Sequence, residues 1–171
     1  MRKVLLALSL IMFFVGPILA QSPNEMKKLS WMIGDWEGEG SIVLGPDKRN
    51  VVQQKENVQG KLDDNVLIIE GIGKEKERIV HHAFAVVSFD RYAKRYLLRA
   101  IKADGDSVDA ETRMTDEAFE WGFQSPQTGK VKYTIKHTDA DEWHETGEYS
   151  RDEGKTWIKF FEMKLRRIKK N

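Results

Sequence analysis

The chain has 171 residues, and its 28 Lys and Arg residues nearly balance its 27 Asp and Glu residues, so that the formal net charge is +1. This length suits one domain around one hydrophobic core, and the balanced charge provides no electric field that would attract nucleic acid or an anionic membrane surface. The absence of cysteine excludes disulfides, thiolate nucleophiles and sulfur-ligated metals.

The N-terminal segment has the three parts of an export signal peptide. A basic start at Arg2 and Lys3 precedes the apolar run Val4–Val15, and a small-residue end follows at Ala20. The apolar run is too short to span a bilayer as an ordinary helix. We therefore expect cleavage of residues 1–20, which leaves residues 21–171 as a single exported domain without a transmembrane anchor, either periplasmic or extracellular.

A short helix, Asn24–Met32, and about ten β-strands are expected to follow the signal. Strand-like runs alternate with turn-forming breakers such as Gly45-Pro46-Asp47. The expected strands are 35–43, 51–59, 66–72, 78–89, 96–103, 108–114, 118–124, 130–138, 142–150 and 156–168. Each breaker is short enough for a hairpin, so consecutive strands should pair antiparallel. Because closure removes the two open sheet edges, the sequence predicts an all-β, roughly ten-stranded up-and-down barrel with a cavity.

The stretch "LSWMIGDWEGEGS", residues 29–41, combines two tryptophans with three glycines at the start of the first strand. Glycine lets a strand bend sharply and lets another segment approach its backbone closely. We expect Gly34, Gly38 and Gly40 to bend the chain here. Trp31 and Trp36 should then lie near one end of the barrel, where an indole fills space and its N–H finds a carbonyl. The stretch is therefore interpreted as structural.

Alternation along two later strands indicates which side chains face inward. One face of the first carries Phe119, Trp121 and Phe123, and one face of the second carries Val131, Tyr133, Ile135 and His137. We take Trp121 and Tyr133 as candidate ligand contacts because of their aromatic area. His137 is the candidate that would offer a ligand a hydrogen bond.

The turn after His137 decides whether it meets a second histidine. A hairpin centred on Ala140 places His137 opposite Trp143 and turns His144 to the other face, whereas a centre between Ala140 and Asp141 pairs the two histidines. Only the second register could form a two-histidine metal or acid/base site. We favour the first register, because it places Trp143 beside His137 on the apolar face.

Arg99 is a fourth candidate for ligand binding, for an acidic head group. It shares strand parity with Leu97 and Ile101, so it enters the cavity if that face is the inner one. A buried guanidinium needs a partner, which a ligand carboxylate, Glu145 or Glu162 would supply. The sequence leaves the facing of Arg99 open.

No recognisable catalytic or metal-binding arrangement occurs. The chain lacks HExxH and EF-hand spacing, a G-x-S-x-G elbow and a phosphate-cradling loop. Paired acids such as Asp104 and Asp106 fit turns, where Asp forms local hydrogen bonds. In "SRDEGKTW" we expect Gly154 in a left-handed turn position, followed by Trp157 as an anchor. We predict no catalytic residue, no metal ligand and no cofactor.

Three segments carry a resemblance to a known family. "MKKLSWMIGDWEGEG" resembles the opening G-x-W-x-G signature of the calycin barrels, which include lipocalins, fatty-acid-binding proteins and nitrobindins. With "VVSFDRYAKRYLLRA" and "GEYSRDEGKTWIKFFEM", the chain is similar to a family of exported, mostly bacterial, lipocalin-like domains of unknown function. The resemblance implies the barrel fold and an internal pocket.

The nitrobindin resemblance raises the question of haem. In that family a histidine on the final strand holds the haem, and the corresponding run here, "TWIKFFEMKLRRI", contains no histidine. Haem is therefore disfavoured. The function we expect is non-covalent binding of a small hydrophobic or amphipathic molecule in the barrel. The alternatives are a haem-dependent or otherwise unrecognised enzyme that uses an internal histidine, and a structural or interaction protein of the cell envelope.

Overall fold

The computed structural model of the protein describes residues 25–45, 48–138 and 140–169. The expected signal peptide and its cleavage site lie outside the described residues. Within these ranges, one 3-10 helix, η1 (Glu25–Met32), is followed by ten strands. The strands are β1 (Gly34–Gly45), β2 (Lys48–Lys61), β3 (Val66–Glu75), β4 (Arg78–Asp90), β5 (Arg95–Lys102), β6 (Ser107–Met114), β7 (Phe119–Ser125), β8 (Gly129–His137), β9 (Glu142–Ser150) and β10 (Ile158–Arg167).

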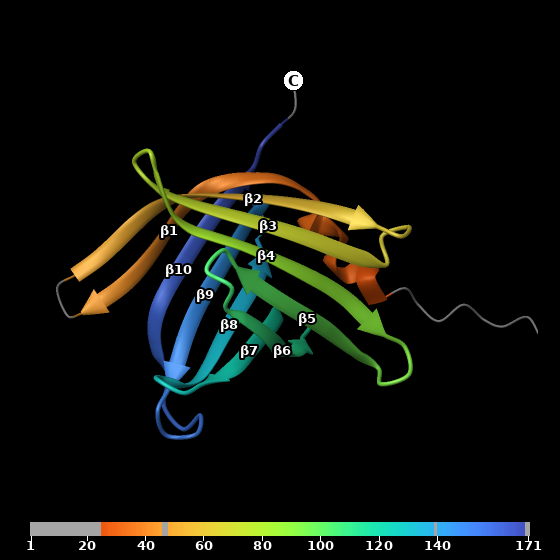
Figure 1. The fold of residues 1–171 in the computed structure, drawn as a ribbon. Helices are drawn as coiled ribbons and strands as arrows, with labels where there is room; N and C mark the ends of the chain where they lie inside the picture. The colour runs from red at the N-terminus through yellow and green to blue at the C-terminus, as the bar shows by residue number, and fades with distance from the viewer. Residues whose placement is uncertain (1–24, 46–47, 139, 170–171) are drawn as a thin grey trace, which may run out of the picture.

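The ten strands form one closed antiparallel barrel (Figure 1). Each strand pairs with its neighbour in sequence, and β1 closes the sheet by pairing with β10, for example Gly38 with Leu165. The predicted meander and its closure are confirmed. Closure leaves no free sheet edge, which is the physical reason that short hairpins and many strands favour a barrel.

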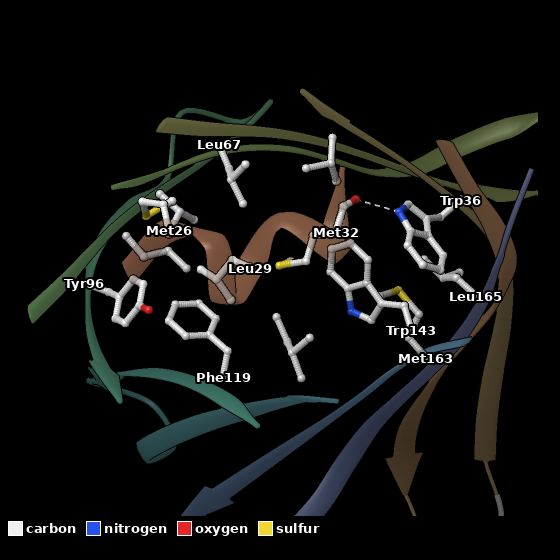
Figure 2. Packing of buried hydrophobic residues seen from close by; sticks show 14 residues of the cluster. Met26, Leu29, Met32, Trp36, Leu67, Tyr96, Phe119, Trp143, Met163 and Leu165 are labelled. Atoms are coloured by element: carbon white, nitrogen blue, oxygen red, sulfur yellow. Dashed lines mark hydrogen bonds between the residues drawn. The ribbon is translucent and has the colours of Figure 1, made fainter. Parts of the chain in front are cut away.

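Helix η1 fills one end of the barrel. Its buried side chains, Met26, Leu29 and Met32, point into the hydrophobic core shown in Figure 2. The strands contribute the other side of this core through Trp36, Leu67, Tyr96, Phe119, Trp143, Met163 and Leu165. Burial of this apolar surface supplies most of the free energy that holds the helix against the barrel.

Trp36 links the helix to the first strand, as the sequence predicts for an indole at the barrel end. Its side chain is completely buried, and Nε1 donates a hydrogen bond to the carbonyl oxygen of Met32 at 2.7 Å (Figure 2). This bond satisfies a carbonyl at the end of the helix, which has no partner within the helix. Trp31 packs edge to face against Trp36, with 5.9 Å between ring centroids.

The glycines of β1 differ in what they accommodate. A Cβ at Gly38 would overlap the carbonyl oxygen of Lys164 and lie 3.0 Å from the Cα of Leu165, so only glycine allows β10 to approach this closely. At Gly40 a Cβ would make an ordinary contact with Val52 at 3.4 Å. The close approach expected of the glycine run is therefore concentrated at Gly38 and at Gly34, whose Cβ would lie 2.7 Å from Nη1 of Arg167.

The turn between β9 and β10 has the expected form. Gly154 has a φ of +94°, in the left-handed region that glycine adopts without strain. Trp157 donates from Nε1 to the carbonyl oxygen of Gly154 at 3.1 Å, and the ammonium of Lys132 lies 4.6 Å from its ring centroid. Both residues stabilise the hairpin.

Candidate functional site

A groove of about 1460 Å³ opens at the barrel end that η1 fills. Its lining comes from four segments that are distant in sequence: η1, the β4–β5 hairpin, the β6–β7 hairpin and the end of β8. The lining residues are Glu25, Lys28, Leu29, Trp31, Phe89, Arg91, Lys94–Tyr96, Thr112–Phe119 and Ile135–Thr138. The groove therefore depends on the closed barrel, because closure brings these segments together.

The inner wall of the groove is apolar and aromatic. Tyr96 packs edge to face against Phe89 and Phe119, with ring centroids 5.1 Å and 5.4 Å away. Its hydroxyl donates to the carbonyl oxygen of Glu25 at 2.8 Å, which ties β5 to the first residue of η1. Burial, followed by the Glu25 carboxylate, raises the pKa of Tyr96 to about 12, so the hydroxyl stays protonated and keeps donating.

The rim of the groove is basic. Lys28 pairs with Glu25 at 2.6 Å, and Lys136 lies 3.5 Å from Glu117. Four other basic residues line the rim: Arg91, Lys94, Arg95 and Arg113. Among the described residues, no carboxylate lies within 4 Å of their charged groups. The lining also includes the acidic residue Asp116, and Arg95 stands opposite Asp90 in the β4–β5 pairing. The rim still carries more positive than negative residues beside an apolar wall.

His137 lies at the edge of the groove and has the predicted register. It is paired with Trp143 across β8 and β9, and His144 faces outward, where it contacts Glu162 at 3.0 Å. The ring of His137 stacks on Trp31, with 4.6 Å between centroids, and its Nε2 lies 2.8 Å from Oδ1 of Asp141. Trp31 and Asp141 therefore hold the His137 ring in place at the edge of the groove.

Trp121 and Tyr133 face the barrel interior beyond the groove. They are the next inward positions after Phe119 and Ile135 along β7 and β8, and their rings stack with centroids 4.2 Å apart. Neither residue lines the groove. The structure thus brings Trp121 and Tyr133 together and leaves His137 at the barrel end.

Two glutamates share this interior with the aromatic pair. Glu145 on β9 accepts hydrogen bonds from Nε1 of Trp121 and from Nε1 of Trp143, each at 3.3 Å. Glu56 on β2 accepts one from Nε2 of Gln54 at 2.8 Å. The five residues, together with Tyr133, are called the interior cluster below.

Burial controls the ionisation of both glutamates. It raises the pKa of Glu56 to about 8, against the hydrogen bond from Gln54, and the Glu145 charge raises it further. Burial also raises the pKa of Glu145 to about 7, against the hydrogen bonds from Trp121 and Trp143. At neutral pH the two carboxyls therefore carry fewer than two negative charges between them.

Arg99 lies on the outer face of the barrel. Its Nη1 donates to both carboxylate oxygens of Asp109 on β6 at 3.2 Å, and its side chain is 57% exposed. The register places Arg99 opposite Asp109 and Val86, while Leu98 on the other parity is buried. Arg99 therefore does not point into the barrel, as its proposed role in ligand binding requires. Its ion-pair partner is Asp109 and not Glu145 or Glu162.

The groove rim and the two glutamates are the features that sequence reasoning missed. A signal for the glutamates was present, because Glu56 shares strand parity with Val52 and Val58, and Glu145 shares it with Trp143. A polar residue on an otherwise apolar face marks a group that the fold buries. The rim had no comparable signal, since its basic residues lie in hairpins where exposed charge is ordinary.

Two features are absent from the described part of the chain. No three His, Asp or Glu side chains are grouped there so that they could hold a metal ion. No helix within residues 25–45, 48–138 and 140–169 has the length and apolar character needed to cross a bilayer.

Comparisons with known proteins agree with the fold. The chain is similar to the crystal structure of Rv2717c from M. tuberculosis, with 12% identity and a TM-score of 0.62 over 86% of this chain and 99% of that one. At this identity the likeness concerns the fold alone. A comparison with curated proteins gave no match. The model of one family, described as "Protein of unknown function (DUF1579)", matches residues 21–167, and the chain therefore belongs to the DUF1579 family.

Proposed function

We propose that the protein binds a small amphipathic anion non-covalently, with its apolar part against the groove wall and its acidic group at the basic rim. The observation that carries this proposal is the combination, in one groove, of the Tyr96 aromatic wall with rim cations that have no ion-pair partner among the described residues. A barrel of this kind is an architecture in which small ligands commonly bind.

The size and chemistry of the groove support this class of ligand. A volume of 1460 Å³ exceeds the roughly 300–1,000 Å³ of typical small-molecule pockets, so an extended alkyl or polycyclic body can enter. Arg91, Arg95 and Arg113 line this groove, and guanidinium groups are planar donors that suit carboxylate, sulfate or phosphate oxygens. Arg95 and Arg113 have the outward parity of their strands and line the groove close to the strand ends. These side chains are exposed to water, so a neutral ligand would gain nothing from their charge, whereas an anion would pair with it.

The test uses dodecanoate and its neutral counterpart, 1-dodecanol, in calorimetric titrations of the protein without residues 1–20. We expect dodecanoate to bind at least about tenfold more tightly, because only it carries a charge for the rim. The variant R113E should remove most of this preference. The matched control is R99E, which changes an arginine on the outer face that lies outside the groove.

Equal affinities for the acid and the alcohol would contradict the proposal, as would an absence of binding. An equal loss in R99E and R113E would show that net charge, and not the groove, governs the affinity.

A further inference from the structure

The interior cluster contains negative charge without a protein cation beside it. No Lys, Arg or His of the described residues forms an ion pair with Glu56 or Glu145. Arg167 is the inward-facing cation in the same row of paired residues as Glu56, because both pair with Trp36 on β1. Its guanidinium already donates to the carbonyl oxygens of Trp31 and Ile33 and to Asp141. On β4, burial and then the Lys102 charge lower the pKa of His81, so this residue is neutral at physiological pH.

Several polar atoms of the cluster have no hydrogen-bond partner among the residues that the structure describes. Glu145 receives one indole N–H on each oxygen, whereas Glu56 receives only the Gln54 amide, on Oε1. Within the described residues, no donor reaches Oε2 of Glu56 or Oε1 of Gln54, and the Tyr133 hydroxyl makes no hydrogen bond. Every fully enclosed side-chain N or O atom of the described residues that are not exposed has a partner, so these partnerless atoms keep some accessible surface. A ligand donor at that surface would satisfy them.

The backbone makes room for these carboxyl and amide groups. A Cβ at Gly71 on β3 would lie 2.6 Å and 2.7 Å from the two carboxylate oxygens of Glu56, and one at Gly73 would lie 2.7 Å from Oε1 of Gln54. Any larger residue at these positions would displace the polar groups. The glycines therefore hold space for Glu56 and Gln54 over β3.

The wall that continues from these glycines carries small side chains. Ala85 pairs with Ala100 across β4 and β5, and Ala110 on β6 pairs with Leu98; all three share the inward parity of Val87 and Leu98. All three are only partly buried, and Ala100 and Ala110 pack against the hydrophobic core. The next part of the wall in strand order is the Trp121–Tyr133 stack on β7 and β8, and both residues are only partly buried.

We propose that the barrel interior binds a small organic cation, a primary amine with an aromatic body, whose ammonium group lies between Glu56 and Glu145. The ammonium donors would satisfy Glu56 Oε2 and the Gln54 amide oxygen, and the aromatic body would lie along the Trp121–Tyr133 wall. This inference uses residues that do not line the groove and is independent of the proposed anion binding.

Binding of the amine should depend on pH. An alkyl ammonium with a pKa of about 10 stays charged through the neutral range, so only the protein carboxyls change their charge. Gln54, Trp36 and Gly71 surround Glu56, whose charged neighbours are Glu145 and, beyond Trp36, Arg167. Trp121, Trp143, Tyr133, Ile135 and Met163 surround Glu145. Burial raises the pKa of Tyr133 and keeps its hydroxyl neutral. The affinity should therefore rise with pH between about 6 and 8, as the carboxyls release their protons.

Calorimetric titration with tryptamine, 3-ethylindole and indole-3-propionate tests the inference, because the three share one ring system and differ in charge. We expect tryptamine alone to bind with a dissociation constant below about 1 mM, more tightly at pH 8 than at pH 6. E145Q and E56Q, which keep the side-chain shape, should each weaken tryptamine at least about tenfold. The matched control E148Q changes an outward glutamate of β9, paired with Lys132, and should leave the affinity unchanged.

Three results would overturn the inference: no tryptamine binding, equal binding of tryptamine and 3-ethylindole, or unchanged affinity in both E145Q and E56Q. The groove gives a separate readout in the same preparations. R113E should keep tryptamine binding, and E145Q should keep dodecanoate binding, so that failure at one site is distinguished from failure at the other.

Discussion

The guanidinium of Arg167 lies over the indole of Trp36, with 4.1 Å between its central carbon and the ring centroid. The same guanidinium donates at 2.6 Å to the carbonyl oxygens of Trp31 and Ile33. One side chain at the end of β10 therefore completes the closure between β1 and β10 and satisfies carbonyls at the end of η1. This contact holds the helix that forms one wall of the groove.

Replacement of Arg167 should loosen the helix end. R167M removes two short hydrogen bonds and a cation–π contact, and we expect a loss of about 3 kcal/mol in the free energy of unfolding by urea denaturation. The control is R166M, whose side chain is 83% exposed and paired with Glu142, and which should cost less than about 1 kcal/mol. Equal losses in the two variants would contradict the role assigned to Arg167.

Gly38 should tolerate no side chain. In G38A the new methyl group meets the backbone of Lys164 and Leu165, which cannot move without disturbing the β1–β10 pairing. We expect a destabilisation of at least about 2 kcal/mol, measured as a fall in the melting temperature. G45A is the matched control, because a Cβ there meets nothing within 4 Å. A G38A protein as stable as G45A would show that β10 does not approach as closely as described.

Glu145 should make stability fall as the pH rises. Its carboxyl has an ordinary pKa of 4.5 and a folded pKa of about 7, so between these values the unfolded chain has released a proton that the folded chain retains. The contribution of Glu145 to the free energy of unfolding is therefore at its full value below about pH 4.5. As the pH rises toward the folded pKa, this contribution falls by up to about 1.4 kcal/mol per pH unit.

The variant E145Q isolates this effect. We expect it to resemble the wild type near pH 5, where the acid is protonated, and to be more stable at pH 8 by on the order of 2 kcal/mol, measured by denaturation at each pH. His81, whose lowered pKa acts in the opposite direction, is present in both proteins and cancels in the difference. Parallel stability curves for the two proteins would contradict the assignment of a buried, raised-pKa carboxyl.

Much of the fold could be predicted, because each strand combines a two-residue period with a short turn. The face shared by Trp121 and Phe119 and the pairing of His137 with Trp143 both follow from that period and are confirmed. The facing of Arg99 could not be decided, because Leu97 and Leu98 give its strand apolar residues on both parities. Leu97 proves to be 41% exposed and Leu98 buried, and only the closed barrel distinguishes them.

The candidate sites depended more on tertiary structure. The rim residues Arg91 and Lys94 lie in a hairpin. They can be recognised as groove residues only from the tertiary structure, in which this hairpin and η1 line the same groove. Strand parity could have identified Glu56 and Glu145 as inward residues. They interact with each other because the pairing of β1 with β10 brings β2 near β9, and local sequence patterns do not predict this pairing of distant strands. Export and cleavage after Ala20 concern residues outside those described and stay predictions.

The assignment of the groove beside η1 as the ligand site can be tested by amide chemical shifts during a dodecanoate titration of the isotope-labelled protein. Because the ligand would contact four lining segments, we expect the largest shifts in η1, the β4–β5 hairpin around Lys94, the β6–β7 hairpin around Thr115 and the end of β8. Shifts confined to the outer face around Arg99 and Asp109, or no saturable shifts, would contradict this assignment.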